Sequence, residues 1–187
     1  MKSMRKVSRG AGFRGVLDYV FDREPSAESI GKLIGGNMSG ISPRTLASEF
    51  GVVRRLRPDI EKPVWHQALR LPDGDRIAPA KWEAICDRYM ALMGFTDAHQ
   101  RVYVEHPDTA GQHVHIVASR IGVDGTVYLG RNENLRSTQI VAQIEVEFGL
   151  QITKGADFDP VSGKNMMPDA KATLIKSTNS IVRALWP

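Results

Sequence analysis

The sequence has 187 residues, which fits one domain with room for a small appendage. Its formal net charge of +4 is mildly basic, which suits a nucleic-acid partner without requiring one. The single cysteine, Cys86, excludes an internal disulfide framework and favours a reducing compartment, so we expect a cytoplasmic protein. No apolar run approaches the roughly 20 residues of a membrane span, and we expect no membrane insertion.

The first part of the chain alternates short strand patterns with helix patterns. Residues 1–9 predict a short basic strand, and residues 13–23 predict a helix with one apolar stripe. Residues 29–38 predict a second strand. Ser42 is then a candidate N-cap for a helix, since Pro43 follows it at the first helical position.

The second part continues this alternation. Residues 63–71 predict a strand, and residues 79–93 predict the clearest helix, with Gly94 closing it. Further along the chain we expect a short strand at residues 127–129 and a helix at residues 135–148.

Tyr19 stands apart from the apolar stripe of the first helix. At about 100° per residue its side chain lies well round the helix, near Asp18 and Asp22. A core tyrosine should lie on the apolar face, as Tyr89 does on the helix at residues 79–93. An off-stripe tyrosine is usually no more than an exposed residue. Tyr19 gains interest only if a nearby site needs a nucleophile.

Three of the five histidines fall within ten residues, in a pattern that predicts two strands joined by a turn. Residues 101–106 alternate and end in His106, and residues 107–112 predict the turn. His113 and His115 follow, two apart, so their side chains share one face of a strand. The turn would bring His106 back beside them.

Three imidazoles that converge on one point form a site for a divalent metal with open coordination positions, as a catalytic metal needs. A single strand histidine is more often a hydrogen-bonded surface or core residue. The pair at His113 and His115 together with His106 favours the metal site. The spacing names neither the metal nor the reaction.

The order of these elements predicts an α+β fold, in which a central antiparallel or mixed sheet is flanked by helices. Residues 1–155 are expected to form one domain. Residues 156–187 are turn-rich and weakly patterned, and we expect them to form a C-terminal extension, a linker and helix leading towards further domains.

The histidine pattern, from His106-Pro-Asp108 through His113-Val-His115 to Arg120, resembles the motif of plasmid relaxases, which are mobilisation endonucleases of the HUH superfamily. The resemblance extends over about residues 1–150. It includes the tyrosine of the first helix, a strand ending in Gly36-Asn37, and an aromatic-His strand that begins at Trp65. The tyrosine precedes the histidines, whereas rolling-circle initiators and related transposases have the opposite order.

The resemblance implies DNA nicking by transesterification at a plasmid transfer origin, with a 5′-phosphotyrosine intermediate. It implies Tyr19 as the nucleophile and a divalent metal, Mg²⁺ or Mn²⁺, on His106, His113 and His115. His66 corresponds to the histidine of the family's middle motif. His66 and Asp108 are candidates for a base or for a partner of a ligand imidazole. One departure is Arg70, where several relatives carry a serine.

The implied partners are single-stranded DNA at the transfer origin, relaxosome accessory proteins and a type IV coupling protein. The residues that we expect to contact DNA are Arg5, Lys6, Arg9, Arg14, Asn37 and Arg120. Taken singly, each of the cations is more simply a solvated surface charge.

Two other functions fit the same residues. One is a DNA-binding module that has lost catalysis and holds a structural metal. The other is a metal-dependent hydrolase that uses water and does not need Tyr19.

Overall fold

We describe a computed structural model of the protein over residues 1–3, 7–21, 31–106 and 111–153. Its elements in chain order are β1 (Lys2–Ser3), β2 (Ser8–Gly10), α1 (Phe13–Phe21), β3 (Lys32–Gly36), α2 (Pro43–Arg54), β4 (Val64–Arg70), α3 (Pro79–Met93), β5 (His99–His106), β6 (His113–Gly122) and α4 (Glu133–Glu147).

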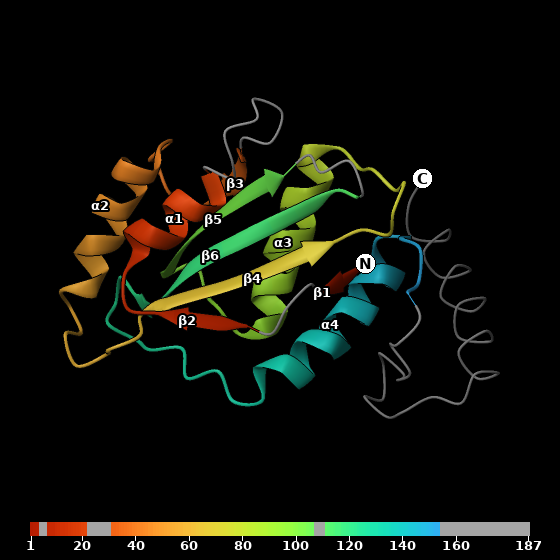
Figure 1. The fold of residues 1–187 in the computed structure, drawn as a ribbon. Coiled ribbons are helices and arrows are strands. Elements are labelled where there is room, and N and C mark those ends of the chain that lie inside the picture. Colours follow the sequence, from red (N-terminus) through yellow and green to blue (C-terminus); the bar gives the residue numbers. More distant parts are fainter. Residues whose placement is uncertain (4–6, 22–30, 107–110, 154–187) are drawn as a thin grey trace.

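The strands form one six-stranded sheet in the order β1-β4-β6-β5-β3, and β2 pairs with β4 beside β1 (Figure 1). Every pairing between these strands is antiparallel. The long hairpin of β5 and β6 lies at the centre, with β4 along its other side. The predicted α+β fold with an antiparallel sheet is therefore confirmed.

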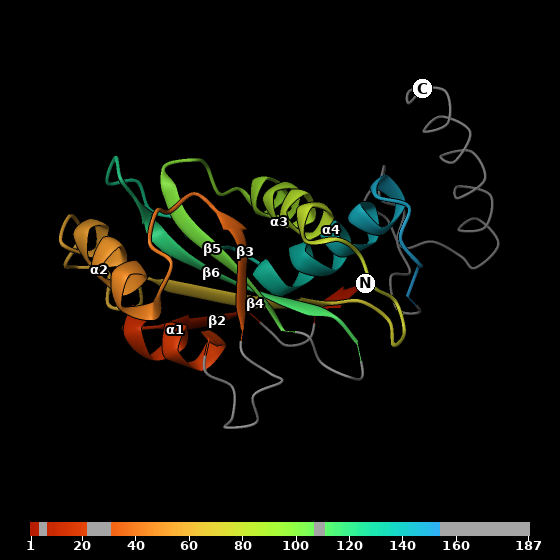
Figure 2. The same ribbon diagram turned by 90° about the horizontal axis from the view of Figure 1, so that it is seen from above.

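Helices cover both faces of the sheet. Figure 2 shows α3 and α4 on one side and α1 on the other. On the α1 side, the apolar residues of α1 and α2 pack on Val102, Val104 and Val117, and the rings of Phe13 and Phe50 stack with their centroids 4.2 Å apart. This smaller core anchors α1 on the same sheet face as the predicted metal ligands.

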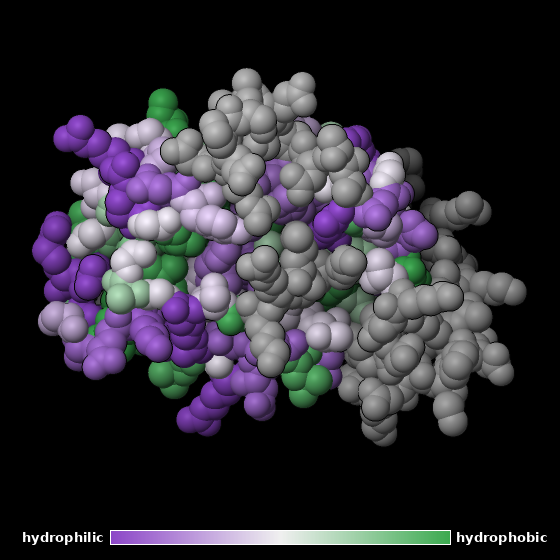
Figure 3. Space-filling view, viewed as in Figure 1, coloured by the Kyte–Doolittle hydropathy of each residue, from purple (hydrophilic) through white to green (hydrophobic). Residues whose placement is uncertain are grey.

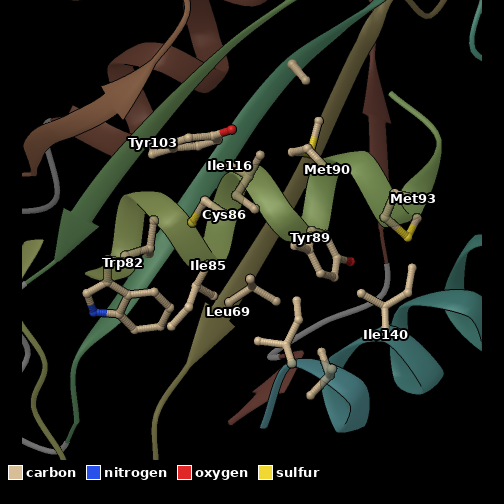
Figure 4. Packing of buried hydrophobic residues seen from close by; sticks show 14 of the residues in the cluster. Leu69, Trp82, Ile85, Cys86, Tyr89, Met90, Met93, Tyr103, Ile116 and Ile140 are labelled. Carbon is tan, nitrogen blue, oxygen red and sulfur yellow. The ribbon is translucent and has the colours of Figure 1, made fainter. Parts of the chain in front are cut away.

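The larger core lies between the sheet and the α3/α4 layer (Figure 4). The sheet contributes Leu69 and Ile116, and α3 contributes its stripe, which includes Trp82, Ile85 and Tyr89. Val114, Ile116 and Ala118 also point into this core, as the alternation of β6 predicts. Since successive residues of β6 point to opposite faces, the histidines between them face the α1 side.

The predicted start of α2 and both predicted ends of α3 agree with the structure. The Ser42 hydroxyl accepts from the Thr45 amide, which completes a capping box, and Pro43 is the first residue of α2. Helix α3 spans the predicted residues, and Gly94 ends it in the left-handed conformation at φ 96°.

Other predictions need correction. Residues 127–129 do not form a strand, because a single bridge between Ile121 and Val127 is all that the structure shows there. The final helix begins at Glu133, two residues before the predicted start. The second strand is confined to Lys32–Gly36 within the described residues.

The extension at residues 156–187, and the domain boundary placed beside it, lie outside the described residues. Within the described part of the chain, no helix combines the length and the apolar character needed to cross a membrane.

Candidate active site

The three predicted ligands come together on the α1 face of the sheet. His106 ends β5, His113 begins β6, and these two residues are register partners across the hairpin. His115 follows two residues along β6. One ring nitrogen from each histidine lies within 4.8 Å of the corresponding nitrogens of the other two. All three side chains are buried.

This donor set fits a divalent metal. Neutral imidazole nitrogens suit first-row transition metals, and three protein ligands leave positions open for water or substrate. Metal–nitrogen bonds are about 2.1 Å long, so a small inward movement of the rings would suffice. The pairing of β5 with β6 sets the spacing of the three rings, and the residues around them bury the rings. Residues of the chain therefore form this arrangement.

His106 is oriented by a contact with α1. Its Nε2 donates a hydrogen bond to the main-chain carbonyl of Val20. That bond assigns the proton of the neutral ring to Nε2 and would leave the lone pair of Nδ1 available to a metal. Gly31 makes the approach possible, because a Cβ at this position would lie 2.1 Å from the Val20 oxygen and 3.0 Å from His106 Nε2.

His115 is oriented by His66, a half-buried residue of β4. His66 Nε2 and His115 Nδ1 are 2.9 Å apart, and the Oγ of Ser8 lies 3.3 Å from His66 Nδ1. If His115 binds a metal through Nε2, its proton is on Nδ1 and is donated to His66. The proton of His66 then lies on Nδ1, directed at the hydroxyl of Ser8.

Tyr19 lies beside this histidine cluster. Its ring meets His115 edge-on, with centroids 5.9 Å apart and planes at 89°, and meets His66 at 6.3 Å and 77°. Its exposed fraction is 40%, so solvent and substrate can reach the side chain. The off-stripe position on α1 thus places the tyrosine at the site.

The other three tyrosines of the chain are buried and remote from this role. The hydroxyl of Tyr89 donates to Ser137 Oγ at 2.7 Å, and that of Tyr103 donates to Asp87 at 2.7 Å. Burial raises the pKa of both phenols, and it raises the pKa of Tyr128 to about 12. Tyr19 therefore combines access with proximity to the histidines, which no other tyrosine does.

Two of the predicted DNA contacts are engaged inside the protein. Arg9 forms an ion pair with Glu133 at 2.7 Å and donates to the carbonyl of Leu129. Arg120 is buried and donates to the carbonyls of Lys62 and Tyr128, at 2.8 and 3.0 Å. Both guanidinium groups bind loops next to the ends of strands. Their N–H groups donate to partners within the protein, which argues against a DNA contact.

Two further predicted contacts are exposed. Arg14 projects from α1 and pairs with Asp18 at 2.7 Å. The Asn37 amide donates to the carbonyls of Asp97 and His99, and its oxygen accepts from the Arg101 amide, so this side chain joins β3 to β5. Figure 3 shows the face of the molecule that carries α1, where hydrophilic and hydrophobic side chains lie intermingled over α1 and α2. Arg5, Lys6 and Asp108 lie outside the described residues.

Sequence reasoning missed Ser8, Gly31 and the Val20 carbonyl as parts of the site. Ser8 lies within a basic stretch and carries no motif. Gly31 reads as ordinary punctuation before a strand. A main-chain carbonyl has no signature in a sequence.

Two comparisons with known proteins found relatives of this chain. Residues 19–150 match the family described as "Relaxase: MobA/VirD2-like, nuclease domain". The chain is also similar to the protein TraI of Escherichia coli, with 24% identity over 154 residues, which cover 79% of this chain and 20% of TraI. The chain thus corresponds to about a fifth of that relative. No solved structure matches it.

Proposed function

Because the chain belongs to the MobA/VirD2-like relaxase nuclease-domain family, we propose that it nicks one DNA strand at a plasmid transfer origin through Tyr19. The observation that carries the proposal is the edge-on contact of Tyr19 with His115 beside the converging histidines. A nucleophile and a metal-binding triad on one sheet face are the parts that a phosphate transesterification needs.

The reaction exchanges one phosphate ester for another. The phenolic oxygen of Tyr19 attacks the phosphorus, the bond to the 3′ oxygen breaks, and the 5′ phosphate stays on the tyrosine. The phenolic proton passes to solvent or a base, and the departing 3′ oxygen gains a proton. The new ester conserves the energy of the phosphodiester bond, so a 3′ hydroxyl can reverse the reaction and reseal the strand.

His106, His113 and His115 would hold a divalent metal, and we propose Mg²⁺ or Mn²⁺ on grounds of cellular availability. Such an ion, when bound, neutralises the non-bridging phosphate oxygens. His66 acts as a positioning residue in this proposal, because its Nε2 contacts His115 and its Nδ1 contacts Ser8. Asp108 remains the candidate base.

The proposed substrate is single-stranded DNA of the transfer origin. By its family, the chain would work in the cytoplasm with relaxosome accessory proteins and a type IV coupling protein. These partners are part of the proposal, since the chain matches only a fifth of TraI.

A cleavage assay tests the proposal. Incubation of the protein with a labelled library of single-stranded oligonucleotides and Mn²⁺ should produce a covalent adduct on a denaturing gel. Tyr19→Phe should abolish the adduct. Tyr128→Phe, the matched control at a tyrosine away from the site, should keep it. An adduct that persists in Tyr19→Phe would refute the assignment of Tyr19 as the nucleophile.

The assay also separates the two other functions. A hydrolase would release a free 5′ phosphate and would not respond to Tyr19→Phe. A non-catalytic module with a structural metal would bind DNA, would not cleave it whichever metal is supplied, and would unfold on chelation.

A further inference from the structure

Arg70 lies on the same sheet face as the histidines and next to one of them. Strand β4 pairs with β6 so that Arg70 is the register partner of His113. The next pair along, Leu71 and Gln112, is joined by a main-chain hydrogen bond of 3.0 Å. Arg70 and His113 therefore form a non-hydrogen-bonded pair, the kind in which side chains approach most closely.

The contacts that the Arg70 guanidinium makes within the fold do not account for its position. Its Nη2 pairs with Asp73 at 3.0 Å, but the Asp73 side chain is 80% exposed, and exposed ion pairs contribute little to stability. Its Nε is buried and has no hydrogen-bond partner among the residues that the structure describes. A buried donor without an acceptor is unfavourable, so the cation is held in an incompletely satisfied state.

The surroundings keep this cation close to the site. A Cβ at Gly111 would lie 3.1 Å from Arg70 Nε and 3.2 Å from its Nη2, so the guanidinium packs against the backbone that leads into β6. The Arg70 side chain is 19% exposed, which leaves part of it open to a ligand.

We propose that Arg70 binds a phosphate of the DNA strand next to the metal site, exchanging Asp73 for the phosphate oxygens. A guanidinium presents two parallel donors to a phosphate, which an ammonium or hydroxyl does not. Arg70 Nε and Nη2 are such a pair, and rotation of the side chain away from Asp73 would offer both. The inference rests on the proposed function, since it takes single-stranded DNA as the ligand of this face.

The first test measures binding of the single-stranded 20-mer oligo(dT) in EDTA, as a function of salt. Loss of one phosphate contact lowers the slope of log K against log salt by about 0.7, or about fivefold in affinity at 0.1 M salt. Arg70→Gln should show this loss. Arg88→Gln is the matched control, because Arg88 is an exposed arginine paired with Glu147 on the opposite layer. An unchanged slope in Arg70→Gln would overturn the proposal.

The second test predicts a change of opposite sign. Asp73→Asn removes the competing carboxylate, so it should strengthen oligo(dT) binding, and this gain should vanish in the Arg70→Gln background. Asp73 is exposed, so the variant should fold. A gain of equal size in both backgrounds would mean that Asp73 acts as a general repulsive charge, and the proposal would fail.

These outcomes are separate from those of the cleavage assay. Binding in EDTA needs no metal and no nicking, so an Arg70 contact can hold where no adduct forms. Normal adduct formation with an unchanged salt slope in Arg70→Gln would refute the Arg70 contact alone. A parent protein that does not bind oligo(dT) would overturn the Arg70 contact as well.

Discussion

The Nε2 of His106 donates a hydrogen bond to the carbonyl of Val20, the residue that follows Tyr19 on α1. The two partners are 86 positions apart in the chain. This bond orients the ring of His106, a candidate metal ligand. It also holds in place the helix that carries the candidate nucleophile. The relative placement of metal and tyrosine thus depends on one contact between a side chain and the main chain.

The contact predicts an asymmetry between two ligand histidines. His106→Ala should weaken the docking of α1, because the buried Val20 carbonyl loses its donor at a cost of about 1 kcal/mol or more. His113→Ala should leave α1 docked. Hydrogen exchange of the α1 amides in EDTA measures this, and faster exchange in His106→Ala alone is the expected result. Equal exchange in both variants would contradict it.

Gly31 should be intolerant of a methyl group. Gly31→Ala places a Cβ against the Val20 oxygen, so the carbonyl must move away from His106. We expect lower Mn²⁺ affinity by calorimetry and weaker nicking. Gly15→Ala on α1 is the matched control, since a Cβ there meets no atom within 4 Å and alanine favours the helix. Parent-like metal affinity in Gly31→Ala would refute the coupling.

His66 should tune metal affinity through His115. His66→Leu removes the acceptor for His115 Nδ1–H, and loss of such a partner typically lowers affinity about 10- to 100-fold. His66→Gln keeps an acceptor near the position of Nε2 and should restore most of the affinity. Titration with Mn²⁺ by calorimetry compares the two. Equal losses in both variants would show that the ring, and not its acceptor, is required.

The histidine triad should bind transition metals in the order Mn²⁺ < Co²⁺ < Ni²⁺, because imidazole nitrogen is borderline in softness. His115→Ala should lose most of this affinity while its melting curve in EDTA stays near that of the parent. The physical reason is that main-chain pairing of β5 with β6 sets the positions of these histidines, and this pairing does not require a metal. Parent-like affinity in both His113→Ala and His115→Ala would exclude the triad as the metal site.

Alkaline pH should destabilise the fold through the buried tyrosines. Burial raises the pKa of Tyr128 to about 12, above the value of about 10 in an unfolded chain. The folded state therefore holds the phenolic proton more tightly. Its stabilising effect is complete below pH 10 and is lost as the pH rises towards 12. Urea unfolding between pH 8 and 11 should show this decline, and Tyr128→Phe should show a shallower one.

The sequence by itself determined the local elements. The capping residues Ser42 and Pro43, the stripe of α3 and its end at Gly94 all follow from interactions within a few residues, and the structure confirms them. The alternation of β6 also assigned its two faces correctly. The start of α4 was placed two residues too late, since its N-cap residue Asn132 makes no side-chain capping hydrogen bond that a sequence pattern could indicate.

The tertiary structure decided what those residues meet. Alternation placed His113 and His115 on one face, but only the strand order brought His66 of β4 to His115 and Arg70 to His113. The sequence also did not show which arginines are exposed. Arg120 is buried and donates to main-chain carbonyls, whereas Arg14 is exposed. Contacts between distant segments depend on how strands pair and helices dock, and a local pattern of residue types does not encode that geometry.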